Sequence, residues 1–215
     1  GLIEMINPEP AYLNHIAGMV SLNEIRSAGL NVVVDSMHGS GSKYISTILE
    51  GGSTRVFEIR SDINPSFPGM IQPEPIEKNL SLLKSKISDV NGDVGLATDG
   101  DADRLGLVDE KGDYISTLHT FALICLHMLE GLNMKGSLVR SITMTNMINK
   151  LGEIYNVPVL DTPVGFKHIG PVMMEEDAIA AGEESGGYAF QGHIPERDGI
   201  LSALFILDMM VRTGK

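Results

Sequence analysis

Residues 30–51, LNVVVDSMHGSGSKYISTILEG, contain the pattern that decides the fold. Residues 30–35 form a short β-branched run, which is typical of a strand buried on both faces of a sheet. A glycine turn follows, and residues 43–50 carry apolar side chains at helical spacing up to the glycine pair Gly51 and Gly52. The stretch predicts a strand–turn–helix unit of an α/β sheet.

The same alternation continues along the rest of the chain. Prolines and glycines between residues 62 and 75 predict a structured loop. The pattern favours two consecutive three-layer α/β/α domains with mostly parallel mixed sheets, covering residues 1–115 and 116–215. Further strands are expected at 54–59, 94–97, 105–108, 137–141, 157–160 and 178–181, and helices at 11–20, 21–28, 76–87, 117–129, 144–151, 166–174 and 198–212.

Composition and charge limit the kinds of partner and the cellular compartment that we expect for this chain. The 215 residues are 43% hydrophobic, so the chain can bury a core, and they carry a formal net charge of -12 with 5% aromatic residues. An acidic chain without a basic patch repels nucleic-acid phosphates and anionic membranes, so we expect neither as a partner. The single cysteine, Cys125, and the lack of a long apolar span favour a cytoplasmic protein.

The most informative segment is TDGDADR at residues 98–104, directly after a predicted strand. Asp99, Asp101 and Asp103 alternate, so their carboxylates can turn to one side of a curled loop, where only a cation offsets their repulsion. Oxygen ligands favour a hard ion, with Mg²⁺ first, and Arg104 adds a bidentate phosphate donor beside it. The loop therefore predicts a site for a phosphoryl group.

Two other interpretations of this loop stay open. Asp99, Asp101, Asp103 and Glu110 fit the spacing of an EF-hand calcium loop, but its sixth position should be Gly and is Arg104 here. A solvated acidic turn is the other alternative. The nearby GSG at residues 39–41 lacks the third glycine of a dinucleotide fingerprint, so it is interpreted as a plain strand-to-helix turn.

A second polar loop, GEESGG at residues 182–187, follows the strand predicted at 178–181. Loops at strand ends are where open α/β sheets bind ligands. Glu183 and Ser185 can accept from and donate to neighbouring sugar hydroxyls, while the glycines permit close approach. The alternative is a helix-capping turn with Ser185 as the N-cap residue.

Residues 99–104, DGDADR, resemble the metal-binding loop of the phosphohexomutases, the family of phosphoglucomutase and phosphomannomutase. The resemblance implies that Asp99, Asp101 and Asp103 hold Mg²⁺, that a phosphoserine on another domain completes its ligands, and that Arg104 steadies the same phosphate. It also implies an isomerase that moves a phosphoryl group between the 1- and 6-positions of a hexose through a hexose 1,6-bisphosphate.

The second loop is similar to the sugar-binding loop of the same family, which implies that Glu183 and Ser185 contact two adjacent hydroxyls. TPVGFK at residues 162–167 also resembles a family loop, with Gly165 and Lys167 at the matching positions. Lys167 is a candidate phosphate contact or, equally, a solvated lysine. Val164 replaces a frequent Thr, so no hydroxyl is available there.

The general base stays open. Some relatives carry a His where this chain has Gly187, and others a basic residue at the position of Arg197. Arginine does not release its proton at ordinary pH, so Arg197 is expected to stabilise charge. His193 could shuttle protons or be a plain polar residue.

The resemblance covers the second and third of the family's four domains. We therefore expect a two-domain excerpt whose partners are a hexose phosphate and the missing first and fourth domains of the same polypeptide, and which has no mutase activity alone. A non-catalytic metal-binding module and a Mg²⁺-dependent phosphatase are the alternatives. The motifs do not distinguish glucose, mannose and glucosamine phosphates, although Glu184 favours glucose by analogy.

Overall fold

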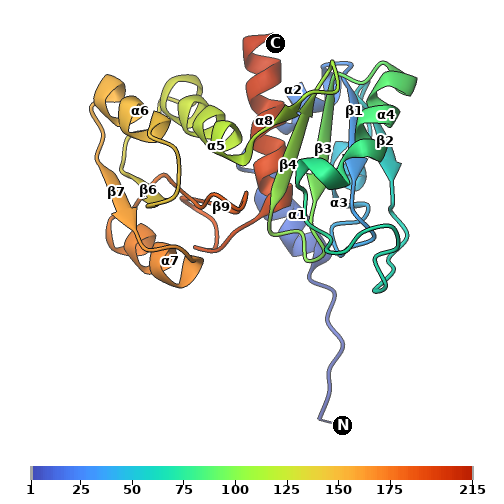
Figure 1. Ribbon diagram of the computed structural model, residues 1–215, viewed down its shortest axis with the longest axis horizontal. Coiled ribbons are helices and arrows are strands. Elements are labelled where there is room, and N and C mark those ends of the chain that lie inside the picture. Colours follow the sequence, from blue (N-terminus) through green and yellow to red (C-terminus); the bar gives the residue numbers. More distant parts are fainter. Residues whose placement is uncertain (1, 215) are drawn as a thin grey trace.

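The computed structural model describes residues 2–214, which fold around two open β-sheets on either side of a long C-terminal helix (Figure 1). The first sheet has the strand order β2-β1-β3-β4-β5. Strand β1 pairs in parallel with β2 and β3, whereas β4 is antiparallel to both β3 and β5. Its strands are β1 (Asn31–Asp35), β2 (Arg55–Ile59), β3 (Val94–Thr98), β4 (Leu105–Asp109) and β5 (Tyr114–Ile115).

The second sheet repeats this path with one strand fewer. Its order is β7-β6-β8-β9, with β6 parallel to β7 and β8, and β9 antiparallel to β8. The β3–β4 and β8–β9 connections are therefore topologically equivalent. The strands are β6 (Leu138–Ser141), β7 (Val159–Thr162), β8 (Ala180–Gly182) and β9 (Tyr188–Phe190).

Helices cover both faces of each sheet because strand side chains alternate between faces. In β1, Val33 packs in one buried cluster with Leu83 of α4, while Val32 packs in another with Ile25 of α2. In the second sheet, Val139 packs with residues of α7 on one face. The helices are α1 (Glu9–Ala17), α2 (Leu22–Ser27), α3 (Tyr44–Leu49), η1 (Glu77–Asn79), α4 (Ser81–Val90), α5 (Thr117–Leu126), η2 (His127–Gly131), α6 (Met147–Tyr155), α7 (Phe166–Glu175) and α8 (Gly199–Thr213).

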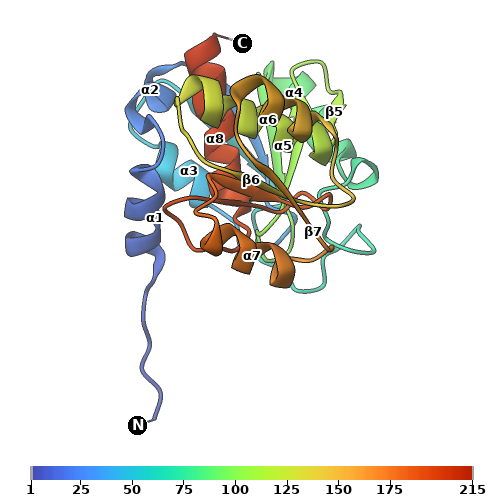
Figure 2. The same cartoon turned by 90° about the vertical axis from the view of Figure 1, so that its left-hand side faces the viewer.

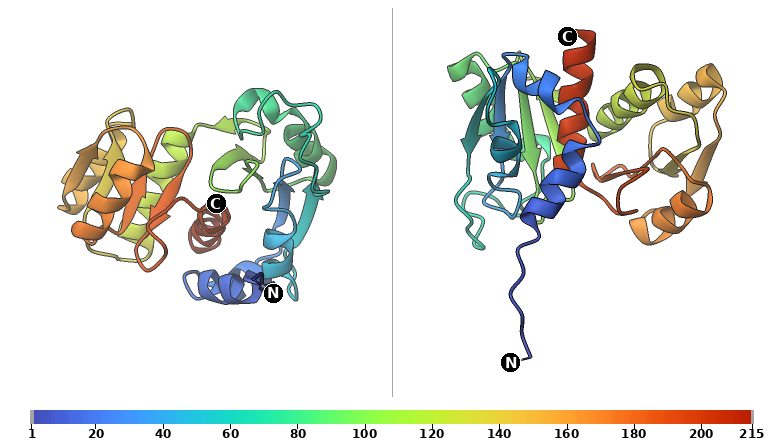
Figure 3. Two further views of the ribbon diagram at one scale, coloured as in Figure 1. Left: turned by 90° about the horizontal axis from the view of Figure 1, so that it is seen from below. Right: turned by 180° about the vertical axis from the view of Figure 1, so that it is seen from behind.

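Helix α8 lies between the two sheets and packs against both (Figures 1 and 3). The ring centroid of its Phe205 lies 4.6 Å from that of Phe190 in β9. Its Asp208 carboxylate is 2.8 Å from His127 Nε2 at the end of α5 and accepts the Ser21 backbone N–H at the start of α2 at 2.9 Å. This helix therefore fixes the placement of the two sheets and of the loops at their edges.

The predicted fold class, two α/β/α units with mixed sheets, is confirmed. The short strands β5 and β9 were not predicted, because two or three residues give too short a pattern. The helix expected at 76–87 divides into the 3₁₀ turn η1 and α4, and that expected at 117–129 ends in the π-helical turn η2. The division at residue 115 stays a prediction.

Before α1 the chain runs as an extended segment away from the sheets (Figure 2). Within the described residues no helix is long and apolar enough to cross a membrane.

Candidate active site between two hairpin loops

The loop at residues 99–104, called the metal loop below, joins β3 to β4 at the edge where β1 and β3 end. Ala102 has a left-handed backbone (φ +63°), and its N–H donates to the Asp99 carbonyl at 3.2 Å. This tight turn brings the carboxylates of Asp99, Asp101 and Asp103 together, so that one oxygen of each lies within 4.8 Å of the others. The three acids that alternate in sequence do converge, as the motif predicted.

The glycine turn after β1 supports the metal loop from behind. Ser40 N–H donates to the Gly100 carbonyl at 3.0 Å. A Cβ atom added at Gly39 would lie 2.6 Å from that carbonyl oxygen, and one at Gly41 would lie 2.9 Å from Cβ of Ala102. The turn at residues 39–41 therefore has to be glycine-rich because the metal loop packs against its backbone. Sequence spacing gave no sign of this contact.

Charge is poorly balanced in the metal loop. Asp99 is only 5% exposed, and its burial together with the charge of Asp103 raises its pKa to about 8. The backbone N–H of Arg104 donates to Asp99 at 3.0 Å, and the guanidinium lies 3.5 Å from the same carboxylate and 3.2 Å from Glu74. Arg104 is shared with Glu74 and does not by itself offset three converging acids, so the loop favours a bound cation.

The turn at residues 183–187, called the sugar turn below, joins β8 to β9. Ser185 Oγ donates to Glu183 Oε1 at 2.7 Å, and Glu183 is 6% exposed. No helix begins at Ser185, because the strand β9 follows the turn. The helix-capping alternative for this segment is therefore wrong.

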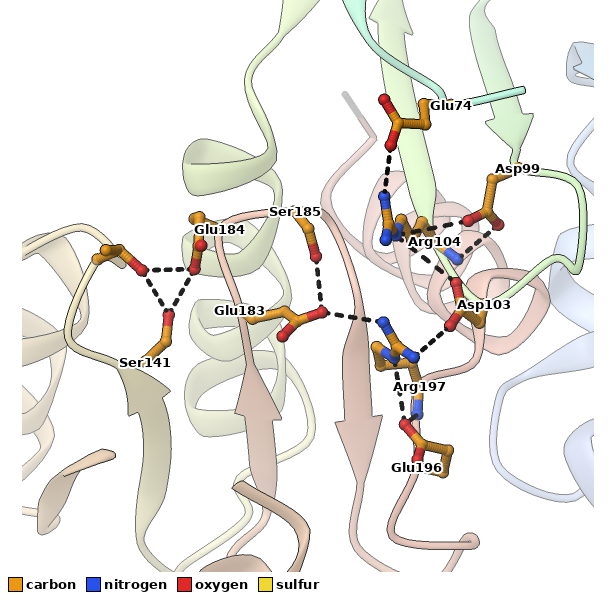
Figure 4. Close-up of polar contacts among 11 residues, drawn as sticks. Glu74, Asp99, Asp103, Arg104, Ser141, Glu183, Glu184, Ser185, Glu196 and Arg197 are labelled. Atoms are coloured by element: carbon orange, nitrogen blue, oxygen red, sulfur yellow. Dashed lines mark hydrogen bonds and ion pairs between the residues drawn. The ribbon is translucent and has the colours of Figure 1, made fainter. Parts of the chain in front are cut away.

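Glu184 points away from the other two side chains (Figure 4). Its carboxylate accepts hydrogen bonds from Ser141 at 2.8 Å and Thr143 at 2.5 Å, at the end of β6. Burial acts to raise the pKa of Glu184, but these hydroxyl donors outweigh it and lower the pKa. Glu184 therefore anchors the sugar turn and does not face the other polar groups.

The two loops meet edge to edge. Leu105 N–H donates to the Gly186 carbonyl at 3.0 Å, and Arg104 and Gly187 form an isolated antiparallel bridge. Gly186 has φ +98°, a conformation that disfavours other residues. Backbone pairing thus joins the two equivalent connections of the two sheets.

Arg197, just before α8, spans the junction (Figure 4). One guanidinium nitrogen lies 2.7 Å from Asp103 in the metal loop, and the other lies 3.0 Å from Glu183 in the sugar turn. The guanidinium also lies 5.5 Å from the ring centroid of Phe166. Burial acts to lower the pKa of Arg197, but Asp103 and Glu183 outweigh it and raise the pKa. Phe166 was not singled out from the sequence.

A cleft of about 470 Å³ opens beside the metal loop, and Asp101, Asp103 and Arg197 line one side of it. Its other polar lining residues include Ser40 from the glycine turn and Tyr12 from α1. The volume is in the range of small-molecule sites, and the lining includes two of the three converging acids but neither Glu183 nor Ser185 of the sugar turn.

The structure does not bring His193 into contact with either loop. Its Nε2 lies 2.9 Å from Asp198, and its ring stacks on His15 at 5.1 Å between centroids. Gly165, with φ +109°, caps α7 beside Phe166, and Lys167 is exposed on the first turn of that helix. The predicted phosphate contact of Lys167 stays a prediction.

Comparisons with known proteins match both units. The model of the phosphoglucomutase/phosphomannomutase α/β/α domain II matches residues 10–112, and that of domain III matches residues 117–215. The chain belongs to the phosphoglucomutase/phosphomannomutase family.

Individual relatives agree with this assignment. A phosphoglucomutase/phosphomannomutase of Thermococcus kodakarensis is 30% identical over 95% of this chain and 44% of its own length. A phosphoglucosamine mutase of Solidesulfovibrio magneticus is 29% identical over 89% of this chain and 42% of its own. The chain spans less than half the length of these relatives.

Solved structures show the same arrangement. A Thermus thermophilus structure described as a phosphomannomutase is 32% identical and superposes with a TM-score of 0.94, covering 100% of this chain and 49% of its own. A family protein from Burkholderia thailandensis is 24% identical, with a TM-score of 0.86, and covers 97% of this chain and 45% of its own. The resemblance seen in the two loops thus extends through the whole fold.

Proposed function

We propose that this chain forms the metal- and sugar-binding half of a cytoplasmic phosphohexomutase, which moves a phosphoryl group between the 1- and 6-positions of a hexose. The observation that carries the proposal is the backbone contact between the metal loop and the sugar turn, with Leu105 N–H donating to Gly186 at 3.0 Å. This contact brings three acidic side chains and the Glu183–Ser185 pair to one edge, which supports a cation site beside a sugar site.

The donor set of the metal loop fits Mg²⁺. Three carboxylate oxygens within 4.8 Å of one another, from Asp99, Asp101 and Asp103, suit a small hard dication and leave positions for a phosphate oxygen. When bound, Mg²⁺ would neutralise negative charge on the transferring phosphoryl group. Arg104 would add a second positive charge on the same side.

The sugar turn provides orientation. Glu183 and Ser185 would exchange their mutual 2.7 Å hydrogen bond for bonds to two adjacent hydroxyls, in either orientation of the sugar. Gly165 and Lys167 would approach the phosphate that is not reacting. Two solved structures of Aspergillus fumigatus N-acetylphosphoglucosamine mutase, which share this fold, are complexes with GlcNAc-6P and magnesium and with glucose 1,6-bisphosphate, and this supports the substrate class.

Candidates for a general base that transfers protons are weaker than those for metal and sugar binding. Arg197 stays protonated and would stabilise charge. His193 is held by Asp198 at 2.9 Å and would act only through a change in that contact. In the whole protein, a phosphoserine and a phosphate clamp on the first and fourth domains would complete the reaction, so we expect no mutase turnover from this chain alone.

Calorimetric titration with glucose 1-phosphate in Mg²⁺ tests the proposal. We expect Glu183→Ala to weaken sugar-phosphate binding about tenfold or more while Mg²⁺ still binds, because Glu183 is not one of the three converging carboxylates of the metal loop but would accept hydrogen bonds from the sugar. Glu175→Ala, at an exposed position on α7, is the matched control and should bind like wild type.

The alternatives give different results. Equal sugar-phosphate binding by wild type and Glu183→Ala would contradict the sugar assignment. Binding of Mg²⁺ together with a complete failure to bind sugar phosphate would indicate a metal-binding module. Hydrolysis of a simple phosphate ester, abolished by Asp99→Asn or Asp101→Asn, would indicate a phosphatase.

A further inference from the structure

Arg197 holds one group from each loop at the same time, through separate nitrogens at 2.7 Å from Asp103 and 3.0 Å from Glu183. We propose that Arg197 acts as an internal cation that closes the metal loop onto the sugar turn, and that Mg²⁺ competes with it for Asp103, so that metal binding loosens the hold on Glu183. The inference rests on the proposed function for the identity of the two sites.

The planar fork of arginine is what makes the bridge possible. Two nitrogens point in fixed directions, so Asp103 and Glu183 can both be bound without bending the side chain. The third contact of the Arg197 guanidinium, to the Glu196 carboxylate at 3.1 Å, involves a side chain that is 56% exposed. A lysine has a single charged nitrogen and would serve one loop at a time.

Gly187 provides the space for this bridge. A Cβ atom added there would lie 2.2 Å from Cδ and 2.6 Å from Cγ of Arg197. Gly187 does not have a left-handed backbone, so alanine is compatible with its conformation. The position of the Arg197 side chain therefore depends on the absence of a side chain at residue 187.

Coulomb repulsion gives the direction of the coupling. Asp103 is both a proposed metal ligand and the partner of Arg197, and a dication bound to it reduces its attraction for the guanidinium. The guanidinium then no longer ties Glu183 to the metal loop, so the sugar turn can move to meet a sugar hydroxyl. Removing the arginine charge removes this competitor for Asp103 and should therefore strengthen Mg²⁺ binding.

The test titrates Mg²⁺ alone into the 215-residue protein and follows amide hydrogen exchange at residues 183–187. We expect Arg197→Met to bind Mg²⁺ roughly fivefold more tightly or better, the lower end of typical site-to-site coupling. In wild type, Mg²⁺ should speed exchange in the sugar turn, and in Arg197→Met this response should be lost.

Gly187→Ala keeps the charge of Arg197 but displaces its side chain. In this variant too, Mg²⁺ should no longer speed amide exchange in the sugar turn. Glu196→Ala removes only the contact between Arg197 and the exposed Glu196 carboxylate, and it should behave as wild type. Unchanged or weaker Mg²⁺ affinity in Arg197→Met, or a sugar turn that does not respond to bound Mg²⁺ in wild type, would overturn the inference and leave the proposed function intact. No Mg²⁺ binding by any variant would overturn both.

Discussion

The metal loop and the sugar turn occupy the same place in two sheets of the same topology, yet the pKa values of their carboxyl groups are shifted in opposite directions. In the metal loop, burial and Asp103 raise the pKa of Asp99 to about 8. In the sugar turn, hydroxyl donors from Ser141 and Thr143 outweigh burial and lower the pKa of Glu184. One loop needs a cation from outside, whereas the other is satisfied by its own neighbours and can offer Glu183 to a neutral ligand.

The largest expected effect is on the metal loop. Asp101→Asn removes an exposed carboxylate that makes no hydrogen bond within the described residues, so the fold should be unaffected. Even changes outside the ligand shell cost about 10–100-fold in metal affinity, so we expect a loss on the order of 100-fold. Calorimetry with Mg²⁺ measures it, with Asp89→Asn on α4 as the control. An unchanged affinity would show that the acids do not act together.

The opposite pKa shifts predict opposite responses to pH. Asp99 has to lose its proton before it ligates, so Mg²⁺ affinity should fall by up to about tenfold for each pH unit below 8. The pKa of Glu184 should lie below its ordinary value and should not change when Mg²⁺ binds. Carbon-13 NMR of the side-chain carboxyls follows both groups. A normal pKa for Asp99 in the metal-free protein would remove the contrast between the loops.

The support of the metal loop can be tested through Gly39. A Cβ atom at this residue would lie 2.6 Å from the Gly100 carbonyl oxygen and 2.8 Å from that of Asp99. We expect Gly39→Ala to lower the free energy of unfolding by about 1–3 kcal/mol and to weaken Mg²⁺ binding as well. Denaturant unfolding measures the first effect. Gly18→Ala, with its nearest atom 3.4 Å away, should change neither.

The smallest effect is expected in the sugar turn. Ser141→Ala removes one of two hydroxyl donors to Glu184, which should raise the pKa of Glu184 and cost about 1 kcal/mol of stability. Sugar-phosphate affinity should fall while Mg²⁺ affinity stays as in wild type. A change in Mg²⁺ affinity of the same size would mean that the anchor acts on both loops.

Local sequence was enough for the fold class and for most strands and helices, because buried strands such as β1 and β3 carry continuous apolar runs. It also predicted the convergence of Asp99, Asp101 and Asp103, since their alternation and Gly100 are local features. Short strands such as β9 left no such pattern.

Contacts between distant segments could not be predicted in the same way. The packing of Gly39 on the metal loop and the fit of Arg197 over Gly187 depend on how the two sheets are placed around α8. The sequence predicted Arg197 as a charge stabiliser but did not indicate which acids it joins. Nor did it show that Glu184 faces Ser141, so the analogy that linked Glu184 to sugar preference has no contact to support it.

The most direct measurement is an anomalous difference map from crystals soaked in Mn²⁺ and glucose 1-phosphate. The account predicts one strong peak within bonding distance of Asp99, Asp101 and Asp103, with sugar hydroxyls on Glu183 and Ser185 across the junction. A map with no peak in the metal loop, or a sugar phosphate bound away from the sugar turn, would contradict it.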